Sequence, residues 1–208
     1  MFNKHNPKIN NYAQRHPDNL FKVILMVSLS IQQKWSLVGD MLSDVEEFKA
    51  DSIFIWGNKK LTYSYMTTHI HFIYAQMLAV LNSKNLTDNA KAISLMKIFL
   101  KIPGLNLAKA GFVCQLVFGL VGCMDVHNIK TYGVDPKSLD YNKKCKTQRG
   151  LQNNRQKLNK YINLCHDYGT ENLWNSWCNM IAHKYPDDFV DGYHVSELHY
   201  TYLTGEYK

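Results

Sequence analysis

Apolar residues recur at helical spacing along almost the whole chain, and alternating strand patterns are rare and short. Spacings of three and four residues place apolar side chains on one face of a helix, whereas a strand needs strict alternation. The chain is therefore predicted to be all-α. Helices are expected over residues 20–35, 36–48, 63–82, 88–102 and 107–118, from residue 125, over 151–168 and 170–185, and in a last short segment that contains Val195, Leu198 and Tyr202.

The cysteine pattern and the apolar runs exclude several classes of protein. The five cysteines form no C-x-x-C pair and no tight cluster of four, which argues against a disulfide scaffold, a zinc site and an iron–sulfur site. The longest apolar runs, 23–31 and 112–124, are well below the ~20 residues that span a bilayer. Residues 1–19 lack the apolar core of a signal peptide. We expect an intracellular protein with no metal and no membrane partner.

Positive charge is concentrated in one stretch, residues 137–160, called the basic segment below. It holds eight lysine and arginine residues and one acid, Asp140, so its net charge equals the +7 of the whole chain. A local basic block on a neutral body favours a polyanionic partner, because each neutralised phosphate releases counterions. The alternative is a solvated charged loop.

Residues 100–113 read L-K-I-P-G-L-N-L-A-K-A-G-F-V and predict two helices joined by a Pro-Gly turn. Such a turn directs several amides toward one phosphate at the positive end of the second helix. Gly104 lets a backbone approach closely, and Asn106 tolerates a left-handed conformation. We expect the side chain of Leu105 to pack between the two helices. The predicted phosphate donors are the amides of Gly104, Leu105, Asn106 and Leu107.

This segment resembles the hairpin of the helix-hairpin-helix DNA glycosylase superfamily, which includes endonuclease III and the 8-oxoguanine glycosylases. The family pattern is L-P-G-[VI]-G-x-K-x-A, followed some twenty residues later by V-D-x-H. Here C-M-D-V-H stands at 123–127, and L-S-I-Q at 29–32 resembles the family's L-S-x-Q segment. The resemblance covers residues 20–133. One departure is Asn106, which replaces the second hairpin glycine and puts the tightness of the phosphate grip in question.

The resemblance implies two helical lobes with a DNA-binding cleft between them. Residues 20–135 would form the lobe with the helix-hairpin-helix, and residues 1–19 with 136–208 the other. The implied partner is duplex DNA with a modified base, bound by a monomer. No iron–sulfur cluster is expected, because Cys165 and Cys178 lie too far apart for the family's four-cysteine loop. The family often holds a monovalent cation at the hairpin carbonyls, which this sequence neither supports nor excludes.

The implied activity is a DNA glycosylase, a hydrolase of N-glycosyl bonds, with or without abasic-site lyase activity. Gln32 would fill the gap left by the extruded base, and Asp125 would stabilise the positive charge that develops on the sugar. A simpler interpretation of Asp125 is a helix N-cap, and the two roles are compatible. His127 would orient substrate or backbone, although a lone histidine is more often structural.

Lys109 has two interpretations. In bifunctional members of the family a hairpin lysine attacks the sugar as an amine. An alignment without gaps places that lysine on Ala108, so Lys109 is rotated by about 100° on the helix. It is either the nucleophile or a phosphate contact. Two further functions stay open: a non-catalytic helix-hairpin-helix DNA-binding protein, and a glycosylase-like enzyme of viral DNA base modification rather than base excision repair. The location would be the cytoplasm, the nucleoid or a phage-infected host cell.

Overall fold

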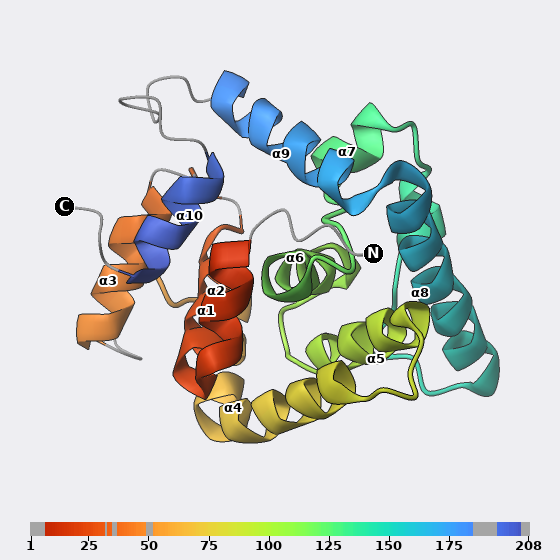
Figure 1. Cartoon of the computed structure of the whole chain (residues 1–208), viewed down its shortest axis with the longest axis horizontal. Helices are drawn as coiled ribbons and strands as arrows, with labels where there is room; N and C mark the ends of the chain where they lie inside the picture. The colour runs from red at the N-terminus through yellow and green to blue at the C-terminus, as the bar shows by residue number, and fades with distance from the viewer. Residues whose placement is uncertain (1–6, 32, 35–36, 49–51, 185–194, 205–208) are drawn as a thin grey trace.

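The computed structural model describes residues 7–31, 33–34, 37–48, 52–184 and 195–204 (Figure 1). Within these ranges the chain forms ten α-helices, one 3-10 helix and no strand, which confirms the all-α prediction. The elements are α1 (Pro7–Arg15), α2 (Pro17–Leu29), α3 (Val38–Phe48), α4 (Asn58–Asn82), α5 (Asp88–Leu100), α6 (Leu107–Phe118), α7 (Val126–Thr131), η3 (Pro136–Leu139), α8 (Gln148–Tyr168), α9 (Thr170–Lys184) and α10 (Val195–Thr204).

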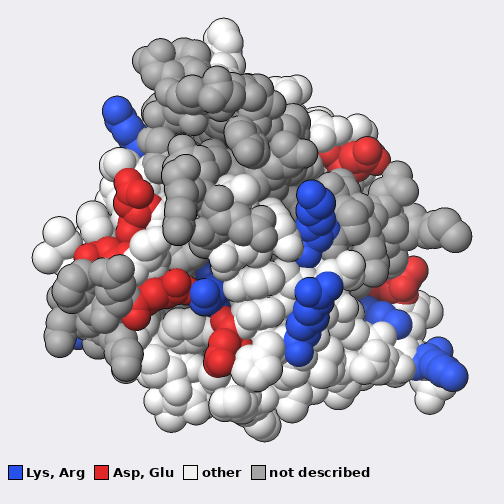
Figure 2. All heavy atoms as spheres, turned by 60° about the vertical axis from the view of Figure 1, so that its left-hand side comes forward, with Lys and Arg blue, Asp and Glu red and all other residues white. Residues whose placement is uncertain are grey.

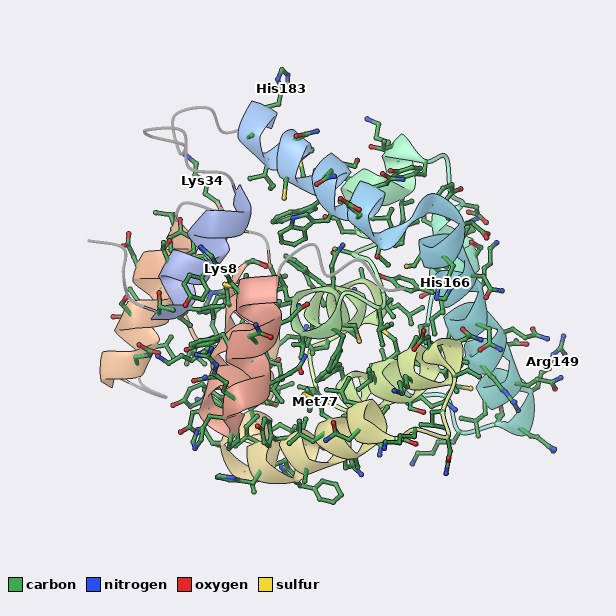
Figure 3. All side chains as sticks on the ribbon, viewed as in Figure 1. Lys8, Lys34, Met77, Arg149, His166 and His183 are labelled. Atoms are coloured by element: carbon green, nitrogen blue, oxygen red, sulfur yellow. The ribbon has the colours of Figure 1, made fainter. Side chains whose placement is uncertain are left out.

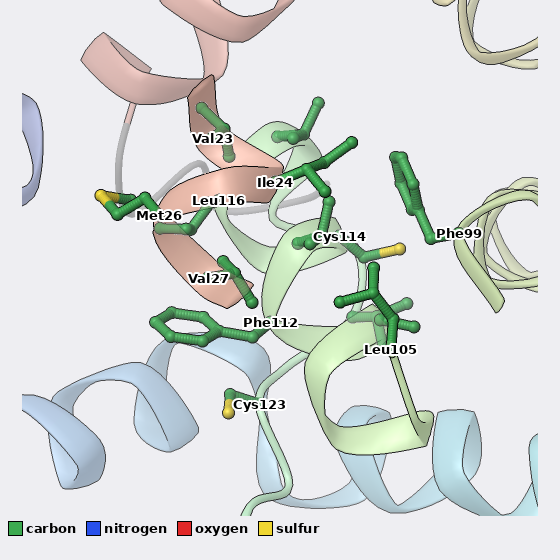
Figure 4. Close-up of a cluster of buried hydrophobic side chains, with 14 of the residues drawn as sticks. Val23, Ile24, Met26, Val27, Phe99, Leu105, Phe112, Cys114, Leu116 and Cys123 are labelled. Carbon is green, nitrogen blue, oxygen red and sulfur yellow. The ribbon is translucent and has the colours of Figure 1, made fainter. Parts of the chain in front are cut away.

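The core is built around α6, which is apolar on all sides. Every residue from Ala110 to Phe118 is buried, as expected of a helix that other helices surround. Helices α1, α2 and α5 pack against it. Figure 4 shows part of this contact, with Val27 of α2 beside Phe112 of α6. The hairpin that α5 and α6 form is therefore anchored through its second helix in the centre of the molecule.

The remaining helices surround this centre. Helix α8 packs against α5 and α9, and α9 also contacts α7 and α10. Helix α10 returns to α1, α2 and α3 (Figure 1). Buried apolar side chains from both predicted lobes belong to one connected cluster. The division into lobes stays a prediction.

Several helix boundaries differ from the expected ones. Helix α2 stops at Leu29, with Ser30 as C-cap, rather than continuing to residue 35. The polar segment 7–15 forms α1, which sequence periodicity did not predict. Helix α4 begins at Asn58, five residues early, because Gly57 adopts a positive φ of 52° and lets the chain enter the helix directly after the turn.

The basic segment lies on η3, on α8 and on the loop between them, away from α3 and α10 in Figure 1. Arg149, at the start of α8, points away from the body of the molecule (Figure 3). Figure 2 views the molecule from the side of α3 and α10, where acidic and basic side chains are intermixed. In the described part of the chain, no helix has the length and apolar character required to cross a membrane.

Candidate functional site

The turn between α5 and α6 has the geometry of a tight hairpin. The amide of Ile102 donates to the carbonyl of Phe99, and that of Leu105 donates to the carbonyl of Ile102 at 3.4 Å. Leu105 is buried, which confirms that its side chain packs into the core. Its amide donates within the turn, and the role of Leu105 as a phosphate donor stays a prediction. Gly104 has a φ of 84°, in the region that favours glycine.

Gly104 is also pressed against the first turn of α4. A Cβ atom on this residue would lie 2.4 Å from the Thr62 hydroxyl oxygen and 2.8 Å from the Asn58 carbonyl oxygen. The Thr62 hydroxyl donates to the carbonyl of Pro103 at 2.7 Å. The glycine therefore serves a contact between the hairpin and α4, in addition to the positive φ.

We expect Gly104→Ala to destabilise the fold by about 1–3 kcal/mol, because it adds a steric clash to the strain of a positive φ. For a chain of this size, each kcal/mol lowers Tm by roughly 2–4 °C. Gly133→Ala is the matched control, since Gly133 has a φ of 65° and nothing within 4 Å of an added Cβ. Thermal melts that show equal losses in the two variants would refute the role of the contact with α4.

Asn106 caps α6 rather than adopting the expected left-handed conformation. Its φ and ψ are −91° and −175°, and its side-chain oxygen accepts a hydrogen bond from the Lys109 amide at 3.0 Å. An asparagine at this position satisfies one of the free donors of the helix start, which a glycine cannot do. In the described structure no acceptor is found for the predicted donors Gly104, Asn106 and Leu107, nor for the amide of Ala108. These amides remain for an anion.

The carbonyl oxygens of the turn accept hydrogen bonds from a lysine of the basic segment. The Lys143 ammonium donates to the carbonyl oxygens of Ile102 and Leu105, at 2.7 and 2.8 Å. Partial desolvation of this ammonium lowers its pKa. The sequence showed Lys143 only as one of many basic residues, because its partners lie about forty positions away. A monovalent cation at the hairpin stays a prediction; here two of its carbonyls bind Lys143.

Lys109 points into the protein at the first turn of α6. Its amine lies 3.4 Å from the Ser30 hydroxyl and 5.6 Å from the centre of the Phe112 ring. Burial lowers the pKa of this amine, and the negative charge of Asp125 opposes part of that effect. In the described structure no carboxylate oxygen lies within 4 Å of the amine. The amine is therefore easier to deprotonate than an exposed lysine.

Lys109 shares a cavity of about 240 Å³ with a second amine, that of Lys59, and we call this cavity the lysine pocket. Lys59 is 4% exposed, and its amine lies 5.2 Å above the ring of Trp56. Burial, and then the charge of Lys109, lower the pKa of Lys59. The pocket is lined by Ile31, Trp56, Asn58, Lys59, Gly104, Asn106 and Lys109.

Asp125 is the N-cap of α7, which confirms the simpler interpretation of this residue. One carboxylate oxygen accepts from the amides of His127 and Asn128, at 3.0 and 3.1 Å. The half-buried carboxylate also borders a second cavity of about 490 Å³, the carboxylate cavity. Its lining consists of Asn106, Leu107, Ala108, Met124, Asp125, Val126, Ile129, Pro136, Lys137, Leu139, Asp140, Tyr141 and Tyr161.

The loop that precedes Asp125 is fixed by buried hydrogen bonds. The Tyr161 hydroxyl donates to the Gly122 carbonyl at 2.8 Å and accepts from the Met124 amide at 2.9 Å. The side-chain oxygen of Gln115, on α6, accepts from the Cys123 amide at 2.9 Å. The carboxylate therefore has a defined place relative to the hairpin. Asn106 borders both cavities, whereas Asp125 lines only the carboxylate cavity and Lys109 only the lysine pocket.

Two predicted site residues remain, His127 and Gln32. His127 is half-buried and contributes its backbone amide to the cap of α7. Gln32 lies outside the described residues. Sequence analysis missed Lys59 and Trp56, for which the only signal was a Trp-Gly-Asn turn. No three His, Cys, Asp or Glu side chains of the described ranges are placed to hold a metal ion. Comparisons with family models, with curated proteins and with solved structures find no match to this chain.

Proposed function

We propose that this protein is a DNA glycosylase that extrudes a modified base from duplex DNA and cleaves its N-glycosidic bond, with the Lys109 amine as the nucleophile. The observation that carries the proposal is the Lys109 amine itself. The Lys109 side chain is half-buried at the first turn of the hairpin's second helix, desolvation lowers the pKa of the amine, and the amine lies within the electrostatic influence of Asp125. Amines that act as nucleophiles need a lowered pKa, because only the neutral form carries the attacking electron pair.

The Lys109 amine and the Asp125 carboxylate have different roles in the proposed reaction. The Lys109 nitrogen forms a bond to C1′ of the extruded nucleotide, and the base leaves with the electrons of the glycosidic bond and takes up a proton. Positive charge develops on the sugar as that bond breaks, and the carboxylate of Asp125 stabilises it. Loss of the amine proton and opening of the sugar ring then yield a Schiff base, from which water regenerates the amine or elimination cleaves the strand.

The two cavities suggest how the nucleotide is seated. The carboxylate cavity is mostly apolar and within the 300–1,000 Å³ typical of small-molecule sites, so it has room for a base. The sugar would lie over Asn106, between Asp125 and Lys109. In this arrangement the Lys109 amine approaches the sugar from the side of Asn106 that faces away from Asp125. This direction is consistent with the sequence position of Lys109, one residue after that of the catalytic lysine in the family that the chain resembles.

DNA binding would use the hairpin and the basic segment together. The free amides of Leu107 and Ala108, at the positive end of α6, suit one phosphate. Lys143 ties the turn to the basic segment, whose remaining side chains would follow the backbone. The lobes of the predicted cleft, with Gln32 as the wedge, belong to this proposal.

The decisive experiment offers the protein a panel of duplexes containing uracil, 8-oxoguanine, 5-hydroxymethyluracil, a methylated purine or an abasic site, with borohydride present. Base release together with a reduced covalent adduct is expected for at least one of them. Base release without an adduct would refute Lys109 as the nucleophile. Tight binding without any processing would refute the glycosylase in favour of a non-catalytic DNA-binding protein. Activity on 5-hydroxymethyluracil alone would favour a role in viral DNA base modification.

A further inference from the structure

We propose that the lysine pocket binds a phosphate group of the DNA backbone, the one next to the extruded nucleotide, through Lys59 and the adjoining starts of α4 and α6. This inference rests on the proposed function and adds to it a specific seat for the substrate backbone. Lys59 lies outside the hairpin and outside the other two motifs, residues 29–32 and 123–127, on which the family resemblance is based.

The first argument is an unpaired buried cation. Lys59 is 4% exposed, and its amine has no hydrogen-bond partner in the described structure. Among the residues that the structure describes, no aspartate or glutamate lines the pocket, although a second amine, that of Lys109, does. Burying a charge without a partner costs free energy, so such groups are normally paired. An anionic ligand supplies the missing partner.

The second argument is the direction of two helix starts. Asn58 and Lys59, in the first turn of α4, and Asn106, the N-cap of α6, all line the pocket. Helix α4 is 25 residues long and receives no side-chain cap from Gly57. Helix starts carry partial positive charge and free amides. The pocket therefore combines two amines with two positive helix ends.

The third argument is size and position. At about 240 Å³ the lysine pocket is half the carboxylate cavity and below the usual volume of a site for a whole small molecule. This volume suits a phosphate group better than a whole nucleotide. Since Lys109 lines this pocket and attacks C1′, the nearest phosphate is one that flanks the extruded sugar. The half-exposed ring of Trp56 forms part of the pocket and covers Lys59.

The test compares Lys59→Met with Lys60→Met, which removes the same charge from the exposed neighbouring residue. The probe is a duplex with an uncleavable abasic-site analogue, so binding is measured independently of catalysis. We expect Lys59→Met to weaken binding about tenfold or more, and to reduce the slope of log affinity against log salt by about 0.9. Lys60→Met should bind almost as tightly as the wild type.

A neutral methylphosphonate at the linkage next to the analogue identifies the phosphate. This probe should weaken binding of the wild type and have little further effect on Lys59→Met. Equal sensitivity of the two proteins would overturn the proposal. A second outcome would also overturn it: inorganic phosphate raises the Tm of the wild type but not of Lys59→Met, and the methylphosphonate has no effect on binding. The pocket would then bind free phosphate rather than the DNA backbone.

Stability provides an independent readout. Since Lys59→Met removes an unpaired buried charge, we expect the free variant to gain roughly 2–4 °C in Tm while binding DNA more weakly. A destabilised variant would contradict the argument from the unpaired charge. If the methylphosphonate result holds but the wild type releases no base and forms no adduct, the proposed function fails and the phosphate site stands. If adducts form and Lys59→Met binds DNA as tightly as the wild type, the phosphate site fails and the proposed function stands.

Discussion

Replacing Lys109 by glutamine should abolish the borohydride-trapped adduct and lower the rate of base release about a thousandfold or more. Glutamine has a similar length but no nucleophilic amine, so the covalent route is lost. In the part of the chain that the structure describes, the Lys109 amine contacts the Ser30 hydroxyl and the face of Phe112, and a neutral polar group can occupy the same space. Thermal stability should therefore change little, and DNA affinity should fall less than in Lys59→Met, because the Lys59 amine remains in the lysine pocket. Gel analysis of reduced complexes and single-turnover kinetics measure the two effects.

Lys109→Arg separates the nucleophile from a phosphate contact. Arginine keeps the positive charge but stays protonated, so it retains a phosphate contact and cannot attack C1′. We expect this variant to lose the adduct as completely as Lys109→Gln while keeping DNA affinity. An adduct that survives in either variant would assign the nucleophile to another amine.

The pH dependence of the wild type gives a further check on Lys109. Burial lowers its pKa below the usual 10.5, and the neutral amine dominates only above the pKa of the folded protein. The rate of adduct formation should therefore rise with pH and level off below pH 10.5. Stability should rise with pH between the lowered pKa of the folded protein and the usual 10.5, because in that interval the unfolded chain binds the proton more tightly than the folded one.

The sequence specified the helices whose limits are set locally. Helix α6 begins after the Pro-Gly turn and ends at Gly119, which has a left-handed φ of 70°, and its predicted range matches the observed one. Helix α1 was missed because its residues are mostly polar and only a few, such as Ile9 and Ala13, are buried. The end of α2 was misplaced because the apolar run continues to Ile31 beyond the C-cap.

The candidate site also has features that depend on neighbouring residues and features that depend on distant segments. The cap formed by Asp125 is local, since its acceptor oxygen and donor amides lie within three residues of each other. The burial of Lys59 and the contact of Lys143 with the turn depend on segments about forty residues apart. A single sequence presents both as ordinary charged residues. What the hairpin pattern could not show is that the turn sits against α4, whose first residues complete the lysine pocket.

Replacing Asp125 by asparagine should lower the rate of base release by about a hundredfold to a thousandfold, the loss typical of removing one electrostatic stabiliser of a transition state. Asparagine is as good an N-cap as aspartate, and its side-chain oxygen can accept from the amides of His127 and Asn128 as the carboxylate does. The variant should therefore keep its Tm and its affinity for an uncleavable duplex. Single-turnover base release, thermal melts and titrations with that duplex measure the three quantities.

Asp125→Ala is the control that removes the cap as well as the charge. It should lose about 1 kcal/mol of stability in addition to activity, because two amides at the start of α7 are left without their acceptor. The comparison isolates the charge, since only the asparagine variant preserves the local structure. If the rate of base release by Asp125→Asn is within tenfold of the wild-type rate, Asp125 serves only as a structural cap. A parallel loss of binding and activity would do the same, because a charge that acts only on the transition state leaves ground-state affinity intact.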